Sequence, residues 1–309
     1  MSGIAAALSL LIADPVILGA DQVPLPGNAE VIQARDDGHD RMTVPVAVEG
    51  SGPYRFLIDT GSQRTVVSRT VANSLKLAPG PMVRVVGIAG SGEVATAQVE
   101  EIVFGEQTLF GLTVPLLEDR HMGADGIVGT DGLQGRRVLL DFVNDTIAIG
   151  DEQTLGGNFG YEIVVRARRK SGQLIMTNAL IDGVRTNVVI DTGASVSIAN
   201  RALQRALRER QAGQAQINSV TGQSLTADMG FASELLINDL NINNVLLAFA
   251  DTPAFAELDL DKRPALFLGM RELRAFKRVA IDFETRKVMF DVQRTRARIE
   301  SQSDFSRVK

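Results

Sequence analysis

The chain of 309 residues contains no cysteine and only two histidines. The absence of cysteine excludes disulfides, a thiol nucleophile and a cysteine metal site. Because His39 and His121 are the only histidines, a Ser-His-Asp hydrolase and a histidine-rich metal centre are both disfavoured. We assign each histidine to an ordinary loop and expect neither a metal nor another cofactor.

The chain also lacks a run of basic residues. Its formal net charge is −5, with 22% charged and 45% hydrophobic residues and no tryptophan. A nucleic-acid-binding surface needs clustered Lys and Arg, so this balance argues against nucleic acid as a partner. The composition is ordinary for a globular protein, and the chain is long enough for two hydrophobic cores.

A long apolar run occurs at the N-terminus. Residues 4–20 resemble the hydrophobic region of a signal peptide, although no Lys or Arg precedes them and Asp14-Pro15 interrupts them. The run is short for a membrane span, which needs about 20 apolar residues. We predict that residues 1–20 are an export signal and that the protein is periplasmic or secreted, without stable membrane insertion once the signal is cleaved. The alternative is a buried strand near Pro15 in a cytoplasmic protein.

Two Asp-Thr-Gly triplets carry most of the functional information. Each triplet follows an apolar run and precedes a small residue, Ser62 or Ala194. One such triplet is typical of a turn after a strand. Two copies in matched contexts supply the paired carboxylates of a two-aspartate hydrolase, because contact between like charges keeps one carboxyl protonated while the other is ionised. The triplets are Asp59-Thr60-Gly61 and Asp191-Thr192-Gly193.

The surroundings of the triplets repeat along the chain. After each triplet comes an apolar element that ends in glycine, at Gly129 and Gly269, and then an apolar strand that contains Asp141 or Asp282 followed by Phe. Such self-similarity indicates a duplicated unit. We assign a connector to residues 21–40, the first repeat to 41–150, a glycine-rich linker to 151–160, the second repeat to 161–293 and a polar tail to 294–309.

The triplets, the glycine-rich hairpin after the first of them and the two apolar-glycine elements resemble the retropepsin-like aspartic proteases, in particular bacterial proteins with two copies of the unit. The resemblance covers about residues 41–292. It implies an all-β fold of two similar lobes with short helices and a cleft between the lobes. It also implies a protein or peptide substrate.

Local sequence patterns predict where several elements lie. Alternating and β-branched residues indicate two strands before each triplet. A helix is expected after each triplet, and Leu203, Ala206 and Leu207 have helical spacing in the second. The predicted strands are 42–48, 54–58, 174–181 and 186–190, and the predicted helices are 69–77 and 200–210.

The resemblance assigns Asp59 and Asp191 to a catalytic dyad. The ionised carboxylate would activate water, while the protonated one would donate a hydrogen bond to the scissile carbonyl and later help protonate the leaving amine. The threonine hydroxyls would lock the two loops together, and the glycines would let the backbone turn sharply. Simple turn formation is the alternative reading. The predicted loop-support residues are Thr60, Gly61, Ser62, Thr192, Gly193 and Ala194.

The hairpin after the first triplet resembles a retropepsin flap, which covers the substrate and approaches its backbone. The matching segment of the second repeat has fewer glycines, and neither segment contains the tyrosine of pepsin-type flaps. Plain hairpin turns are the alternative. The predicted flap residues are Gly87, Ile88, Ala89, Gly90, Val220, Thr221 and Gly222.

Two further assignments concern single residues. We predict that the Ser62 hydroxyl donates to the neighbouring carboxylate and gives Asp59 the larger share of negative charge, because Ala194 has no hydroxyl to donate. Asp141 and Asp282 lie in apolar strands away from the triplets, so we assign them structural hydrogen bonds.

The sequence therefore predicts an aspartic endopeptidase whose dyad forms within one chain. Two alternatives stay open: a protease whose dyads form between chains, and a catalytically inactive protease-like module that binds peptides in its cleft. We expect a monomer, with a dimer as the alternative.

Overall fold

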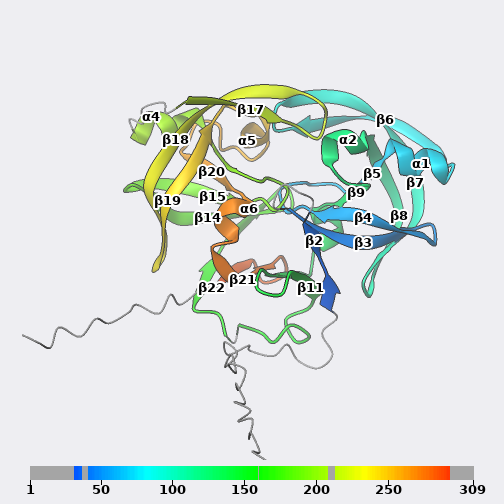
Figure 1. The fold of residues 1–309 in the computed structure, drawn as a ribbon, viewed down its shortest axis with the longest axis horizontal. Helices are drawn as coiled ribbons and strands as arrows, with labels where there is room; N and C mark the ends of the chain where they lie inside the picture. Colours follow the sequence, from blue (N-terminus) through cyan, green and yellow to red (C-terminus); the bar gives the residue numbers. More distant parts are fainter. Residues whose placement is uncertain (1–30, 37–40, 159, 208–212, 293–309) are drawn as a thin grey trace, which may run out of the picture.

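The computed structural model describes residues 31–36, 41–158, 160–207 and 213–292. The predicted export signal at 1–20 and the polar tail at 294–309 lie outside the described residues, as do 21–30 and 37–40 of the predicted connector. Within the described ranges, no helix is long and apolar enough to cross a membrane. The fold consists of two lobes, each with its own β-sheet, and a third sheet that both repeats share (Figure 1).

The first lobe is an eight-stranded sheet in the order β2-β3-β4-β9-β5-β8-β7-β6. The two strands predicted before the first triplet are present as β3 and β4. β9 runs parallel to β4, with Val128 opposite Ile58, so the first triplet leaves the sheet beside the end of β9. The strands are β2 (Arg35–Asp36), β3 (Met42–Val48), β4 (Ser51–Ile58), β5 (Val66–Ser68), β6 (Pro79–Gly87), β7 (Gly90–Phe104), β8 (Gln107–Leu117) and β9 (Gly126–Val128).

The second lobe repeats this arrangement in the order β13-β14-β15-β20-β16-β19-β18-β17. β20 runs parallel to β15, with Leu268 opposite Ile190, which matches the pairing of β9 with β4. The duplication predicted from sequence is therefore a duplication of fold. The strands are β13 (Arg168–Lys170), β14 (Gln173–Ile181), β15 (Val184–Ile190), β16 (Ser197–Ala199), β17 (Gly213–Asn218), β18 (Ser224–Ile237), β19 (Leu240–Phe249) and β20 (Ala265–Leu268).

A six-stranded antiparallel sheet joins the lobes in the order β1-β11-β10-β21-β22-β12. Its two central strands come from different repeats, with Leu139 of β10 opposite Ala280 of β21. This sheet was not predicted from the sequence, because its central pairing joins segments about 140 residues apart. The strands are β1 (Val31–Gln33), β10 (Arg137–Asp141), β11 (Thr146–Gly150), β12 (Ile163–Arg166), β21 (Phe276–Asp282) and β22 (Lys287–Val292).

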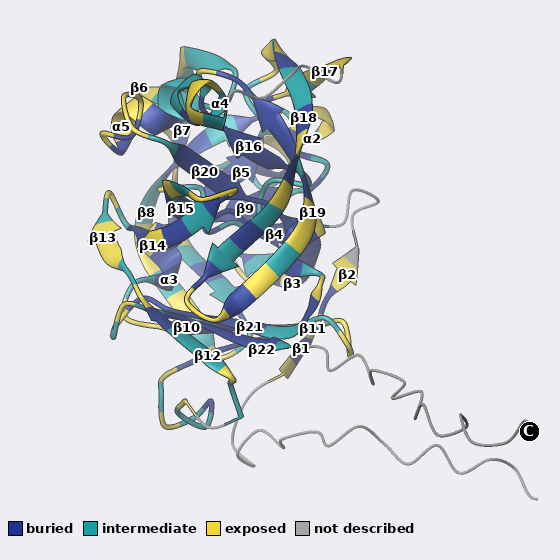
Figure 2. Ribbon diagram, turned by 90° about the vertical axis from the view of Figure 1, so that its left-hand side faces the viewer, coloured by how far each residue is buried: buried dark blue, intermediate teal, exposed yellow. Residues whose placement is uncertain are grey.

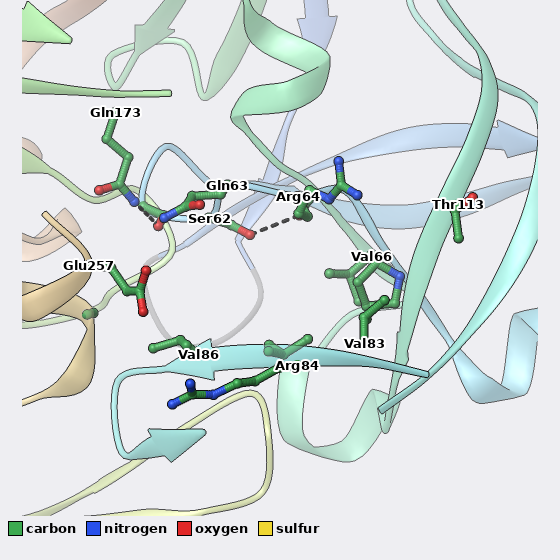
Figure 3. A pocket seen from close by; sticks show the side chains of 14 residues that line it. Ser62, Gln63, Arg64, Val66, Val83, Arg84, Val86, Thr113, Gln173 and Glu257 are labelled. Atoms are coloured by element: carbon green, nitrogen blue, oxygen red, sulfur yellow. Dashed lines mark hydrogen bonds between the residues drawn. The ribbon is translucent and has the colours of Figure 1, made fainter. Parts of the chain in front are cut away.

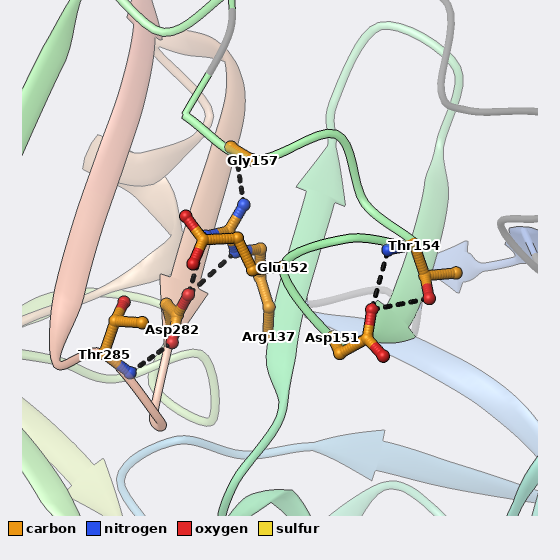
Figure 4. Close-up of polar contacts among 7 residues, drawn as sticks. All are labelled: Arg137, Asp151, Glu152, Thr154, Gly157, Asp282 and Thr285. Atoms are coloured by element: carbon orange, nitrogen blue, oxygen red, sulfur yellow. Dashed lines mark hydrogen bonds and ion pairs between the residues drawn. The ribbon is translucent and has the colours of Figure 1, made fainter.

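A buried ion pair joins the two central strands of this shared sheet at one end, between the first residue of β10 and the last residue of β21 (Figure 4). The Nε and Nη2 atoms of Arg137 donate to one carboxylate oxygen of Asp282 at 3.0 and 2.7 Å, and both residues are 1% exposed. Asp282 also accepts from the Thr285 N–H, and Asp141 accepts from the N–H groups of Val143 and Asn144. The structural hydrogen bonds predicted for Asp141 and Asp282 are confirmed.

The helices in the described residues are short, with four to seven residues each. The helix predicted at 69–77 ends three residues early, because Lys76 adopts a positive φ of 53°. The helix predicted at 200–210 is observed as α4, and residues 208–212 lie outside the described ranges. The helices are α1 (Arg69–Ser74), α2 (Asp119–Met122), α3 (Thr130–Leu133), α4 (Arg201–Leu207), α5 (Pro253–Glu257) and α6 (Met270–Leu273).

One large hydrophobic cluster spans both lobes and the shared sheet. It includes Phe56 and Val128 of the first lobe, Leu268 of the second and Ile281 of the shared sheet. Buried positions run through all three sheets (Figure 2). The strands that carry the two triplets are therefore anchored in a common core.

Candidate active site

The two triplets occupy equivalent turns at the ends of β4 and β15. The N–H of Asp59 donates to the Val128 carbonyl, and the N–H of Asp191 donates to the Leu268 carbonyl, both at 3.0 Å. Each aspartate is thus fixed by the parallel strand beside it. Asp191 is buried, with 8% of its surface exposed, and Asp59 is partly buried.

Thr60 and Thr192 are buried and bond across the interface between the loops. The Thr60 hydroxyl donates to the Ile190 carbonyl at 2.8 Å, and the Thr192 hydroxyl donates to the Ile58 carbonyl at 2.5 Å. Each hydroxyl oxygen accepts the backbone N–H of the other threonine, at 3.0 and 3.3 Å. All four bonds lie within one chain, so a single chain holds the two loops together.

The glycines of the triplets lie directly against the opposite carboxylates. A Cβ atom on Gly61 would lie 2.5 Å from an Asp191 carboxylate oxygen, and one on Gly193 would lie 2.3 Å from the Asp59 carboxylate. Any larger residue would displace a carboxylate. The glycines therefore allow the two carboxylates to approach one another across the lobe interface.

Burial raises the pKa of both carboxyl groups. For Asp191, burial and then the negative charge of Asp59 raise the pKa to about 8. Burial also raises the pKa of Asp59, and the N–H groups of Gly61 and Ser62, at 2.8 and 3.0 Å from Oδ1, oppose the increase. Such a pair titrates as a unit. Over an intermediate pH range one carboxyl is ionised and the other protonated, as acid–base catalysis requires.

The predicted role of the Ser62 hydroxyl is wrong. Its Oγ donates to the Arg64 carbonyl at 2.9 Å (Figure 3), so the hydroxyl serves a local turn. The backbone N–H of Ser62 bonds the Asp59 carboxylate instead. Alanine has the same backbone N–H, and the N–H of Ala194 likewise lowers the pKa of Asp191, so the hydroxyl does not set the asymmetry of the dyad.

The apolar-glycine elements lie against the residues that follow the two triplets. A Cβ atom on Gly129 would lie 2.4 Å from the backbone of Arg64, and one on Gly269 would lie 2.7 Å from the backbone of Val196. Glycine therefore permits a close approach that any side chain would prevent. These contacts hold each loop from below.

Both predicted flap segments are hairpin tips. β6 and β7 are joined at Ile88 and Ala89, and β17 and β18 are joined at residues 219–223. The hairpins arch toward each other (Figure 1), and the Gln223 amide donates to the Ser91 carbonyl at 3.4 Å. The tips also interlock closely, because a Cβ atom on Gly87 would lie 2.5 Å from the Ser219 hydroxyl.

Each hairpin tip packs on the opposite lobe. Ile88 contacts a cluster of the second lobe that contains Phe255, and Val220 contacts a cluster of the first lobe that contains Met122. A Cβ atom on Gly222 would lie 2.5 Å from the His121 ring. His121 was assigned to a loop, but it lies in α2; His39 lies outside the described residues.

A cavity of about 300 Å³ opens beside the loop of the first triplet (Figure 3). Gly61 lines it from the first lobe, Val86 from the first hairpin, and Gln173 and Glu257 from the second lobe. The cavity is part of the predicted cleft between the lobes. Within the described ranges, no group of three or more His, Cys, Asp or Glu side chains could hold a metal ion.

Two side chains that reach the triplet loops were not predicted from the sequence. Arg41 Nη1 donates to the Gly193 carbonyl at 3.4 Å, and Gln173 Nε2 donates to the Gly61 carbonyl. Each lies 18 residues before the aspartate of its own lobe. That equal spacing was visible in the sequence, but the different residue types concealed the correspondence.

A sequence model of the aspartyl protease family matches residues 44–131 and 177–271. Each match contains one Asp-Thr-Gly triplet, and together they cover more than half of the chain. No curated protein matches the chain. With its mostly β architecture of two similar lobes, the chain therefore belongs to the aspartyl protease family, in a two-lobed, retropepsin-like form.

Proposed function

We propose that the protein is an aspartic endopeptidase whose dyad, Asp59 and Asp191, forms within one chain. The observation that carries the proposal is reciprocal contact: each carboxylate lies against the glycine of the other triplet. The threonine bonds across the loops fix this geometry. Membership of a protease family supports peptide-bond hydrolysis in general, and the paired carboxylates support this mechanism in particular.

The charge states suggest a division of roles. Asp59, ionised, accepts a proton from water as the water oxygen attacks the scissile carbonyl carbon. Asp191, protonated, transfers its proton to the carbonyl oxygen and stabilises the developing charge. When the carbon–nitrogen bond breaks, the proton held by Asp59 passes to the leaving amine, and a hydroxyl proton of the intermediate returns to Asp191.

The hairpins suggest what kind of substrate enters the site. Their tips touch each other and pack on opposite lobes, so they close one side of the cleft. A peptide must part the tips before it reaches the dyad, which favours a flexible or unfolded segment over a folded domain.

Incubation with an unfolded protein over a range of pH tests the proposal. We expect new peptide termini, detectable by mass spectrometry, and a bell-shaped pH profile. Activity should rise as Asp59 ionises and fall as Asp191 loses its proton near pH 8. Metal chelators should have no effect, and a peptide with a hydroxyl in place of the scissile carbonyl should compete.

Two outcomes would contradict the proposal. Saturable peptide binding without new termini at any pH would instead indicate a binding module. Loss of cleavage on chelation would indicate a different hydrolytic mechanism.

The flap assignment predicts that Gly90→Val impairs turnover more than folding. Gly90 has a φ of +156° at the hairpin tip, and a Cβ atom there would lie 2.4 Å from the Gln223 side chain. A stiff β-branched residue would hinder both closure and substrate contact. We expect kcat/KM to fall at least about tenfold, which corresponds to about 1.4 kcal/mol of transition-state stabilisation.

Gly92→Val is the matched control, since a Cβ atom there meets nothing within 4 Å. Hydrogen exchange at residues 86–92 should also slow when a peptide inhibitor binds. Equal losses of activity in the two variants, or unchanged exchange at saturating inhibitor, would argue that the hairpin is not a flap.

A further inference from the structure

We propose that Arg41 is a positioning residue that sets the acid limit of the dyad. It holds the catalytic loop of the opposite lobe and places a fixed positive charge beside the two carboxylates. Its counterpart, Gln173, holds the other loop without a charge. The inference rests on the proposed function.

Arg41 lies immediately before β3 and is half-buried. Its Nη2 atom donates to the Met122 carbonyl of α2 at 2.7 Å, while Nη1 donates to the Gly193 carbonyl at 3.4 Å. The first bond anchors the guanidinium group in its own lobe, and the second reaches the loop of the other lobe. Because the Asp59 carboxylate lies against Gly193, this positive charge is held close to the dyad.

Gln173 occupies the equivalent position in the second lobe. Thr43 pairs with Leu57 and Ile175 pairs with Val189, and in each lobe the residue two positions earlier reaches across the interface. Gln173 donates to the carbonyl of Gly61, and the Asp191 carboxylate lies where a Cβ atom of this glycine would be. The two cross-lobe bonds are therefore alike, but only one comes from a charged side chain.

A cation beside a buried carboxylate favours the ionised form. The charge of Arg41 accordingly lowers the pKa of both dyad members, against the larger effect of burial. Without that charge, the dyad would lose its first proton at a higher pH. Since the general base acts only after this proton has left, Arg41 extends activity to lower pH.

Other charged and titratable groups surround the site. Arg84 on β6, Glu257 on α5 and Arg64 on the first loop line the cavity, and His121 lies on α2 beside the second hairpin. These groups are the same in every variant of Arg41. A comparison of Arg41 variants therefore isolates the charge at this one position.

The test compares Arg41→Gln, which carries the uncharged amide of the second lobe, with Arg41→Lys, which keeps the charge. In Arg41→Gln the acidic limb of the kcat/KM profile should move upward by about one pH unit, which corresponds to about 1.4 kcal/mol. In Arg41→Lys the limb should stay in place, although activity falls because an ammonium group cannot make the same paired contacts.

Arg55→Gln is the matched control. Arg55 is exposed and donates to the Gly123 carbonyl. Its replacement by Gln removes one positive charge without changing the dyad, so the acidic limb of the kcat/KM profile should not move. An unmoved limb in a folded Arg41→Gln protein would overturn the inference. Equal movement in Arg41→Gln and Arg41→Lys would also overturn it, because the charge would then play no part. Arg41→Met offers the same comparison if the Gln variant does not fold.

A carbon-13 NMR titration of the aspartate carboxyl carbons separates this inference from the proposed function. Asp59→Asn and Asp191→Asn identify the two dyad signals. A higher first dyad pKa in Arg41→Gln would support the inference even if the protein cleaved nothing. Cleavage by the natural protein with unchanged dyad titration in Arg41→Gln would defeat the inference and leave the proposed function standing.

Discussion

Asp59→Asn and Asp191→Asn are each expected to lower kcat/KM at least about 10³-fold, since proton transfer and oxyanion stabilisation each contribute factors of this order. An asparagine amide neither accepts the proton of the attacking water nor donates the proton that the carbonyl oxygen needs. Its carbonyl oxygen can still accept the N–H of Gly61 or Gly193 that the carboxylate accepts now. We therefore expect loss of turnover with the fold retained, measured by peptide cleavage and circular dichroism.

Asp251→Asn is a suitable control for this prediction. Asp251-Thr252-Pro253 resembles the triplets except that proline replaces glycine, and the Asp251 carboxylate accepts the N–H of Arg201 away from the dyad. Its replacement should leave cleavage intact. Cleavage at the natural rate by either the Asp59 or the Asp191 variant would show that the dyad does not perform the reaction.

Arg137→Met is expected to destabilise the protein by about 3–5 kcal/mol, because removal of one partner leaves the other charge buried and unpaired. The guanidinium group bonds Asp282 across the sheet that joins the lobes (Figure 4), and the two side chains are 0% and 2% exposed. The double variant Arg137→Met/Asp282→Leu should recover most of the loss, since two apolar side chains can replace a buried pair at little cost. Urea unfolding gives the free energy of unfolding of the natural protein, of Arg137→Met and of the double variant.

The exposed pair between Arg69 and Glu118 provides the comparison. These side chains are 43% and 41% exposed, so Arg69→Met should cost no more than about 1 kcal/mol. If Arg137→Met cost as little, or if the double variant were no more stable than the single one, the loss of stability would not come from an unpaired buried charge.

The sequence predicted the two Asp-Thr-Gly turns and the hairpins because their signals are local. A strand that ends in Asp-Thr-Gly and a glycine-rich turn between two strands are defined within a few residues. The duplication then placed equivalent elements in both lobes. The two-lobed β fold could accordingly be predicted without knowledge of long-range contacts.

The features that the sequence did not predict depend on contacts between distant segments. β10 and β21 pair across the repeats, and Arg41 and Gln173 reach the loop of the opposite lobe. No periodicity within a segment indicates such a partner. The prediction for the Ser62 hydroxyl was wrong for a different reason. Two acceptors compete for this hydroxyl, and it donates to the Arg64 carbonyl, two residues away, and not to the carboxylate.

Active-site titration tests most directly whether the Asp59–Asp191 dyad forms within one chain. A tight-binding peptide with a hydroxyl in place of the scissile carbonyl is added to a known concentration of chains while cleavage is followed. We predict that cleavage stops at one inhibitor molecule per chain. An end point at one inhibitor per two chains, as dyads formed between chains would give, would contradict an intrachain dyad.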